Sequence, residues 1–178
     1  LEKLAQSIVA AGGKAIADLL IEMKGKVVQA NQAGLDAASR TALDSDFRAL
    51  REQISTIVAT AEFNSVNLIA SGATTTSVLS TVDGSIIAVS AQSMDTSTLG
   101  IASVDLTTSA GASTALTSID SAITSVSDKL ASLGSTANRI EVQTEFTTTL
   151  IDILTAGLGN LVDADLAEDL ALGFGDPG

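Results

Sequence analysis

The feature that most constrains the fold is a long run of apolar residues at helical spacing between about residues 113 and 161. Apolar side chains recur there at steps of three and four, the period of one helix face, first at Leu116, Ile119, Ile123, Val126, Leu130, Leu133, Ala137 and Ile140, and then in a shifted stripe at Val142, Phe146, Leu150 and Ile153. One helix of this length spans on the order of 70 Å, more than a compact chain of 178 residues allows. We therefore expect an elongated rod.

Two earlier segments carry similar stripes and should fold back along the long helix. The first, roughly 2–33, has a stripe at Leu4, Ile8, Ala11, Ala15, Leu19, Met23, Val27 and Ala30. The second, roughly 40–63, has an unbroken seam at Leu43, Phe47, Leu50, Ile54, Ile57 and Ala61. Three long helical segments thus predict an antiparallel, coiled-coil-like bundle.

Polar residues and glycines add detail to these two segments. The face opposite the second seam carries Asp44, Arg48, Arg51 and Glu52, with Arg48 and Glu52 placed as an i,i+4 ion pair. Gly12 and Gly13 predict a kink or a close approach between helices, and Gly34 predicts a left-handed residue that ends the first helix.

Between residues 64 and 111 the sequence changes to Ser, Thr and β-branched residues with few charges. Val82-Asp83-Gly84-Ser85 has the Asp-Gly pattern of a two-residue type I′ turn between strands at 77–82 and 85–90. A second, irregular hairpin is predicted over Asp95–Leu106. The fold class is mainly α with a small β part: a discontinuous rod domain of 1–63 and 112–170, an inserted β-hairpin region of 64–111, and a truncated or foreign tail of 171–178.

Composition argues against several classes of function. The chain has no His and no Cys, so nucleophilic triads and thiolate metal sites have no support, and it carries no nucleotide-binding glycine motif. The formal charge of −12 disfavours nucleic acid, and the polar residues within Phe63–Val82, the longest uncharged run, disfavour membrane insertion. With no Trp or Tyr to form a sugar platform, a glycosidase built on two carboxylates is also disfavoured. We predict no enzyme, no cofactor and no catalytic or metal residue.

One dense acidic cluster is the candidate cation site; it consists of Asp163, Asp165, Glu168 and Asp169. Several carboxylates suit a hard cation such as Ca²⁺, but the EF-hand spacing and its glycine are absent. The simpler interpretations are a solvated helix face, or a bend after Gly157 and Gly159.

Two stretches resemble bacterial flagellins. Ala61-Glu62-Phe63-Asn64-Ser65-Val66-Asn67-Leu68-Ile69 is similar to the flagellin Ala-x-Phe-Asn-Gly-x-x-Leu-Leu pattern, and Leu161–Glu168 is similar to the flagellin Leu-Val-Asp-Ala-Asp-Met/Leu-Ala-Glu signature. Ser39–Leu43 and Phe47–Ile54 also look like this family. The short insert resembles flagellins of alphaproteobacteria in particular.

This resemblance implies a structural subunit of the flagellar filament, at the bacterial surface and outside the cell, with other flagellin subunits and the family's export and capping proteins as partners. The family's terminal polymerisation segments have no counterpart, and the sequence after Glu168 departs from the pattern, so we expect this piece not to polymerise alone. Two alternatives stay open: a hook–filament junction protein, and a flagellin-like receptor or adhesin for a polysaccharide.

The resemblance also bears on host recognition and modification. Many flagellins carry Arg-Glu-Leu where this chain has Lys24-Gly25-Lys26, so we expect weak or no recognition by toll-like receptor 5. Exposed hydroxyls of the insert are often O-glycosylated in flagellins; a solvated Ser/Thr surface without glycans explains them equally well.

Overall fold

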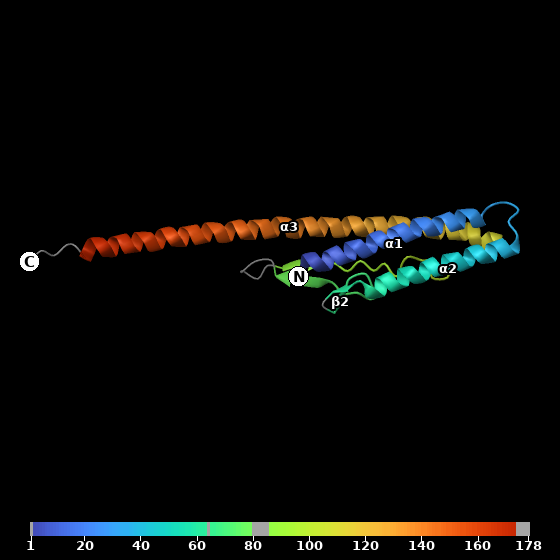
Figure 1. The fold of residues 1–178 in the computed structure, drawn as a ribbon, viewed down its shortest axis with the longest axis horizontal. Helices are drawn as coiled ribbons and strands as arrows, with labels where there is room; N and C mark the ends of the chain where they lie inside the picture. Colours follow the sequence, from blue (N-terminus) through green and yellow to red (C-terminus); the bar gives the residue numbers. More distant parts are fainter. Residues whose placement is uncertain (1, 64, 80–85, 174–178) are drawn as a thin grey trace, which may run out of the picture.

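The computed structural model describes residues 2–63, 65–79 and 86–173, in which three helices lie side by side along one axis (Figure 1). The helices are α1 (Glu2–Ala30), α2 (Ala37–Thr60) and α3 (Ser109–Gly173). α1 packs against both α2 and α3, and α3 continues far past the other two. At 1.5 Å per residue, the 65 residues of α3 span about 100 Å. The predicted rod of three long helical segments is confirmed.

The core of the rod follows a heptad pattern on α1. Its buried positions alternate steps of three and four without a break, and they are Gln6, Val9, Gly13, Ile16, Leu20, Met23, Val27 and Ala30. Of the predicted stripe, Met23, Val27 and Ala30 are fully buried, and Ile8 and Leu19 are partly buried and pack against the core. Ala11 is exposed, and the side chain of Leu4 is outside the described residues. Apolar residues occupy neighbouring positions there, as in Leu19-Leu20, so two registers fit the sequence.

Two glycines let α1 approach its neighbours closely. A Cβ at Gly13 would lie 2.7 Å from Leu130 Cδ2 of α3, and one at Gly12 would lie 3.3 Å from Ile69 Cδ1. α1 continues unbroken through both residues. The alternative of a close approach is therefore confirmed, and the kink is not observed.

Polar contacts join the helix ends. Asp36 is the N-cap of α2 and accepts a hydrogen bond from Ser39 N at 2.7 Å. Arg40 donates to the carbonyl of Ala30 at 2.6 Å, and Asn31 Nδ2 donates to the carbonyl of Ala112 at 2.8 Å. Gly34 has φ +81°, the left-handed conformation that was predicted after α1.

The inserted region contains two short antiparallel pairs. β1 (Glu62–Phe63) pairs with β2 (Val66–Asn67), and β3 (Thr76–Leu79) pairs with β4 (Ile86–Val89). The Asp83-Gly84 turn lies outside the described residues. In the observed register, Leu79 stands opposite Ile86. If the two strands paired without a break up to a two-residue turn at 83–84, Leu79 would instead stand opposite Ala88. Both registers put the same side chains on the same face, because the strand period is two.

The second predicted hairpin, over Asp95–Leu106, is wrong. This segment forms successive turns closed by backbone hydrogen bonds such as Ile101 N to Thr96 O at 3.0 Å, with no strand in it. Leu99, Ile101 and Leu106 are buried in the core. Burial of these side chains, rather than strand pairing, fixes the segment.

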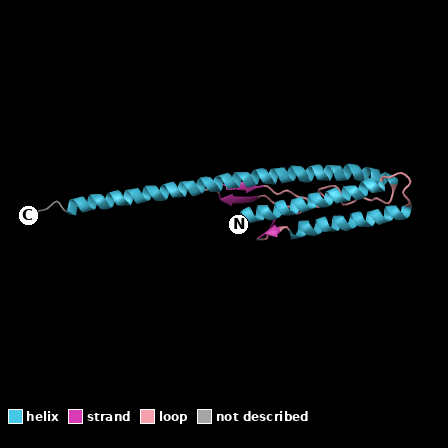
Figure 2. Ribbon diagram, turned by 45° about the horizontal axis from the view of Figure 1, so that its top comes forward, coloured by secondary structure: helices cyan, strands magenta, loops and turns pink. Residues whose placement is uncertain are grey.

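α3 divides into a covered and an uncovered half (Figure 2). Up to Ile140 it packs into the core through residues such as Ile119, Val126 and Leu133. From Glu141 to Glu168, a segment that we call the arm, it extends past the bundle, and nearly every side chain is exposed. The helix continues through Gly157 and Gly159 to Gly173, so the predicted bend is wrong, while residues 174–178 lie outside the described residues.

None of the helices in the described parts of the chain combines the length and the hydropathy needed to cross a membrane.

The close approach at Gly13 gives a stability prediction. Gly13→Leu should destabilise the protein by about 1–3 kcal/mol, because the added side chain overpacks the contact with Leu130 and Met94. Gly134→Ala is the matched control: its Cβ meets nothing within 4 Å, so the better helix propensity of Ala should add up to about 1 kcal/mol. Urea unfolding followed by circular dichroism measures both, and equal midpoints for the two variants would contradict the close contact.

Candidate subunit interface

Most of the exposed large apolar side chains among the described residues lie on the arm. Its exposed large apolar side chains are Val142, Phe146, Leu150, Ile151, Ile153, Leu154, Leu158, Leu161, Val162 and Leu166. The sequence contains no Lys or Arg from Ile140 onward, so every charged side chain on the arm is acidic. A surface both apolar and acidic suits a protein partner that offers apolar and basic groups.

The shifted stripe predicted at Val142, Phe146, Leu150 and Ile153 exists, but it does not face the core. Val142 is 67 % exposed and Phe146 57 %. The heptad seam of the bundle instead continues into the arm through Ile151, Leu154, Leu158 and Leu161, at the same spacing from Ile140. The arm thus carries two separate apolar faces.

A groove of about 690 Å³ lies where the covered half of α3 gives way to the arm. α1 contributes Gln6, Ser7 and Ala10 to its lining, and α3 contributes residues between Leu130 and Thr148. Gln6 Nε2 is buried there without a hydrogen-bond partner. The groove is an opening in the helix seam between α1 and α3.

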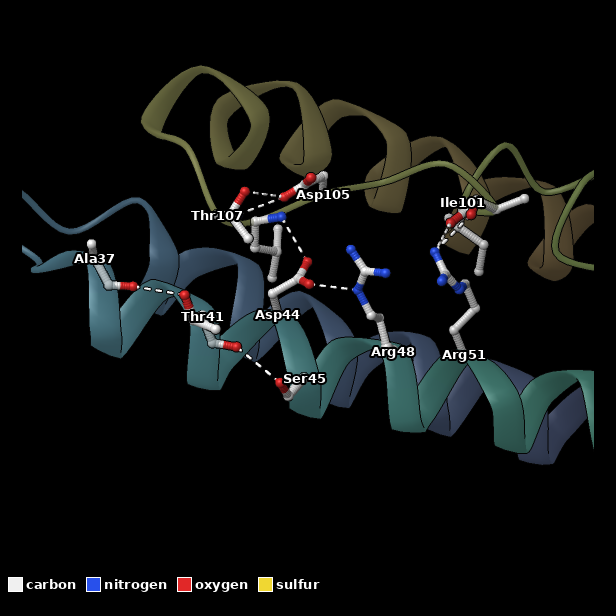
Figure 3. A network of polar contacts seen from close by, with 11 residues as sticks. Ala37, Thr41, Asp44, Ser45, Arg48, Arg51, Ile101, Asp105 and Thr107 are labelled. Atoms are coloured by element: carbon white, nitrogen blue, oxygen red, sulfur yellow. Dashed lines mark hydrogen bonds and ion pairs between the residues drawn. The ribbon is translucent and has the colours of Figure 1, made fainter.

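The strap, which we define as residues 95–108, is held on α2 by a polar network (Figure 3). Asp44 is 5 % exposed; its Oδ1 accepts from Leu106 N at 2.9 Å, and its Oδ2 accepts from Arg48 Nε at 2.5 Å. Arg51 Nη1 donates to the carbonyl of Ala102 at 2.7 Å. The sequence analysis placed Asp44 with the polar residues opposite the seam and paired Arg48 with Glu52. The pairing was wrong: Arg48 pairs with Asp44, which the strap buries, while Arg48 and Glu52 themselves stay exposed.

Two aspartates shape the turns of the strap. Hydrogen bonds from Thr107, through its hydroxyl and its N–H, lower the pKa of the Asp105 carboxyl, and the nearby Arg48 adds to this effect. Partial burial raises the pKa of Asp95, but hydrogen bonds from the Thr98 hydroxyl and N–H outweigh burial and leave that pKa below its ordinary value. Both carboxylates are therefore held in their ionised form.

Lysines of α1 tie it to each neighbouring helix. Lys24 Nζ lies 2.7 Å from Asp120 Oδ1 of α3, and Lys26 Nζ lies 2.8 Å from Asp46 Oδ2 of α2. These are exposed pairs, each worth less than about 1 kcal/mol. They support the placement of α1 between the other two helices.

The acidic cluster near the end of α3 lies on a solvated helix face. Asp163, Asp165 and Glu168 are exposed on the arm, and the side chain of Asp169 is outside the described residues. The described residues contain no group of three acidic side chains arranged to hold a metal ion.

Loss of the buried carboxylate should destabilise the strap. Asp44→Ala leaves the Leu106 N–H buried and unpaired, which costs about 1–3 kcal/mol. Asp46→Ala is the control two residues away: it removes only the exposed pair with Lys26, so the change should stay below about 1 kcal/mol. Equal losses of unfolding free energy in urea for the two variants would show that the Asp44 network does not hold the strap.

The protein should also lose stability in acid. Asp36, Asp95 and Asp105 have lowered pKa values in the folded state, so their stabilising effect is complete above an unfolded pKa of about 4 and disappears as pH falls through the folded values. The urea midpoint should be flat above about pH 5 and decrease below about pH 4. In the Asp95→Asn/Asp105→Asn variant this decrease should be smaller; an unchanged pH profile would exclude these carboxylates as its source.

Comparisons with known proteins agree with the sequence motifs. A model of the bacterial flagellin N-terminal helical region matches residues 3–74, and a model of the C-terminal helical region matches residues 116–171. Flagellin FljM of Caulobacter vibrioides is 41% identical over 165 residues, and flagellin FljK of the same species is 39% identical. Each alignment covers 92% of this chain and 60% of the relative, so the chain spans about three fifths of these relatives' length.

Solved flagellin structures share the fold. Flagellin of Bacillus cereus superimposes with a TM-score of 0.71 at 24% identity, covering 78% of this chain and 81% of the other. FliC of Burkholderia pseudomallei gives 0.68 at 15% identity, covering 77% and 99%. The two family regions occupy well over half of the sequence and fall on the three helices that form the rod. This chain belongs to the bacterial flagellin family.

Proposed function

We propose that this chain is the rod of a structural subunit of the bacterial flagellar filament and serves motility. The observation that carries the proposal is the arm: a long helix that leaves the bundle with its apolar side chains exposed. Such a surface needs partners, and the flagellin family supplies a natural one in further subunits. The proposed location is outside the cell, in the flagellum.

The mechanism is geometric rather than chemical. The heptad seam and the strap fix the bundle as a stiff body, so contacts made at one end hold the other end at a defined position. Many modest contacts between such bodies then add up over a lattice. We propose no catalytic role and no cofactor; the chain has neither His nor Cys to support one.

The proposal extends to the partners that a filament subunit needs. Export and capping proteins of the flagellum would handle the chain before and during assembly, and the acidic, apolar arm is a suitable surface for them. Nucleic acid is a poor partner for a chain of charge −12.

A graft into a relative tests the filament function. Residues 3–171 should replace the matching region of Caulobacter flagellin FljM, with which this chain is 41% identical, in a strain that lacks its own flagellins. We expect filaments in electron micrographs and swimming in soft agar. FljM expressed from the same plasmid is the control, and a chimera that is exported without ever forming filaments would overturn the proposal.

Binding measurements separate the structural function from the adhesin alternative. An anionic polysaccharide would be repelled by the charge of −12 unless Ca²⁺ bridged the two. The filament proposal expects no binding with or without chelator. Chelator-sensitive binding to an anionic polysaccharide would favour the adhesin.

We also propose that toll-like receptor 5 recognises this chain weakly or not at all. Lys24 and Lys26 stand in place of the family's Arg-Glu-Leu, and both are engaged in ion pairs with Asp120 and Asp46. Purified protein should give little signal in a receptor reporter assay beside a flagellin that carries Arg-Glu-Leu. A strong signal would contradict this expectation.

A further inference from the structure

The groove between α1 and α3 is long, open and largely apolar at the end nearer the bundle. Its volume of about 690 Å³ lies in the range of small-molecule sites in proteins. The lining residues of α3 run from Leu130 to Thr148, which corresponds to about 27 Å along the helix. Ala10, Leu133 and Ala137 provide small or aliphatic side chains in the part nearer the bundle. This shape suits an extended apolar chain.

A buried donor without a partner lies near the middle of the groove. Gln6 lines the groove from α1 and is 6 % exposed, and its Nε2 has no hydrogen-bond partner. α1 and α3 are antiparallel (Figure 1), and a Cβ at Gly13 would touch Leu130. Gln6, about two turns earlier on α1, therefore lies level with about Ala137. A buried N–H that lacks an acceptor destabilises the protein, and an oxygen that reaches it removes this penalty. A ligand thus needs an acceptor oxygen at this level.

The other end of the groove, on the arm, is lined by acceptors. Glu141 and Glu145 contribute carboxylates. The hydroxyls of Thr144 and Thr148 donate to the carbonyls of Ile140 and Thr144 at 2.8 and 2.9 Å, so only their lone pairs can face a ligand. None of the lining residues that the structure describes is Lys or Arg. An ammonium group suits this end, whereas a carboxylate or a phosphate would be repelled.

We propose that the groove binds a lipophilic amine that carries an acceptor oxygen between its apolar chain and its ammonium group. The chain lies along Leu130 and Leu133, the oxygen accepts from Gln6 Nε2, and the ammonium pairs with Glu145. Glu145 lies about 12 Å beyond the level of Gln6, and its side chain leans back towards the bundle, so several ångströms separate the two polar groups of the ligand. The site goes beyond the proposed function, because it belongs to a single copy and needs no filament.

Titration with decanoylcadaverine, in which an amide joins a decanoyl chain to a primary amine, tests the site. Isothermal calorimetry below its micellar concentration should show saturable one-to-one binding. N-pentyldecanamide, which lacks the ammonium, and decylamine, which lacks the amide oxygen, should each bind several-fold more weakly. Added salt should weaken the binding of decanoylcadaverine and not that of N-pentyldecanamide, because only the former makes an ion pair. Decanoate and free cadaverine should show no binding.

Two variants assign the polar groups of the site. Glu145→Gln should weaken the binding of decanoylcadaverine several-fold and leave that of N-pentyldecanamide unchanged. Glu168→Gln, on the exposed arm outside the groove, is the matched control and should change neither. Gln6→Leu removes the unpaired donor, so it should abolish the preference for decanoylcadaverine over decylamine and raise the urea midpoint of the unliganded protein.

Several outcomes would overturn the site. They are the absence of saturable binding, decanoate binding as tight as that of the amine, and an unchanged preference for the amide in Gln6→Leu. Equal effects of Glu145→Gln and Glu168→Gln would also overturn it, because the amine would then bind to the acidic arm as a whole. These readouts are independent of the FljM graft: filaments without amine binding would sink this site alone, and amine binding without filaments would sink the filament function alone.

Discussion

The packing of α1 between two helices is the contact on which the rest of the structure depends. Its a and d positions meet α3 and α2 at once, and Gly12 and Gly13 lie where a Cβ would contact Ile69 on one side and Leu130 on the other. Because α1 holds both neighbours, the strap needs only to close the remaining side with Leu99, Ile101 and Leu106. The side-by-side arrangement of the three helices follows from this two-sided contact.

Periodicity predicted most of this architecture because the helices are long. Three stripes with steps of three and four gave the number of helices, their order and the shape of the rod. The register on α1 failed where two apolar residues stand side by side, as at Ile8-Val9 and Leu19-Leu20. One polar residue escaped prediction. Gln6 occupies a buried seam position, where its Nε2 has no hydrogen-bond partner, and the helical spacing of apolar residues cannot indicate such a site.

The polar network of the strap was not predictable from helical spacing. Asp44 stands among Arg48, Arg51 and Glu52, so a pattern of polar residues places it in water. Asp44 is buried by the strap, and it accepts a hydrogen bond from the N–H of Leu106, which lies 62 residues away in the sequence. The same segment was predicted as a hairpin, yet turns closed by Asp95 and Asp105, together with the burial of its apolar side chains, hold it in place. When the partner of a side chain lies far away in the sequence, in a segment without regular secondary structure, the neighbouring residues do not reveal that the side chain is buried.

The arm carries exposed apolar side chains on two faces of one helix. A heptad helix has an inner seam and an outer surface, and here both carry apolar residues beyond Ile140. The seam positions of the arm continue the spacing by which α3 packs into the bundle, so a further helix laid in line with α1 would cover them. The outer positions lie on the far side, and a helix in the seam cannot cover them.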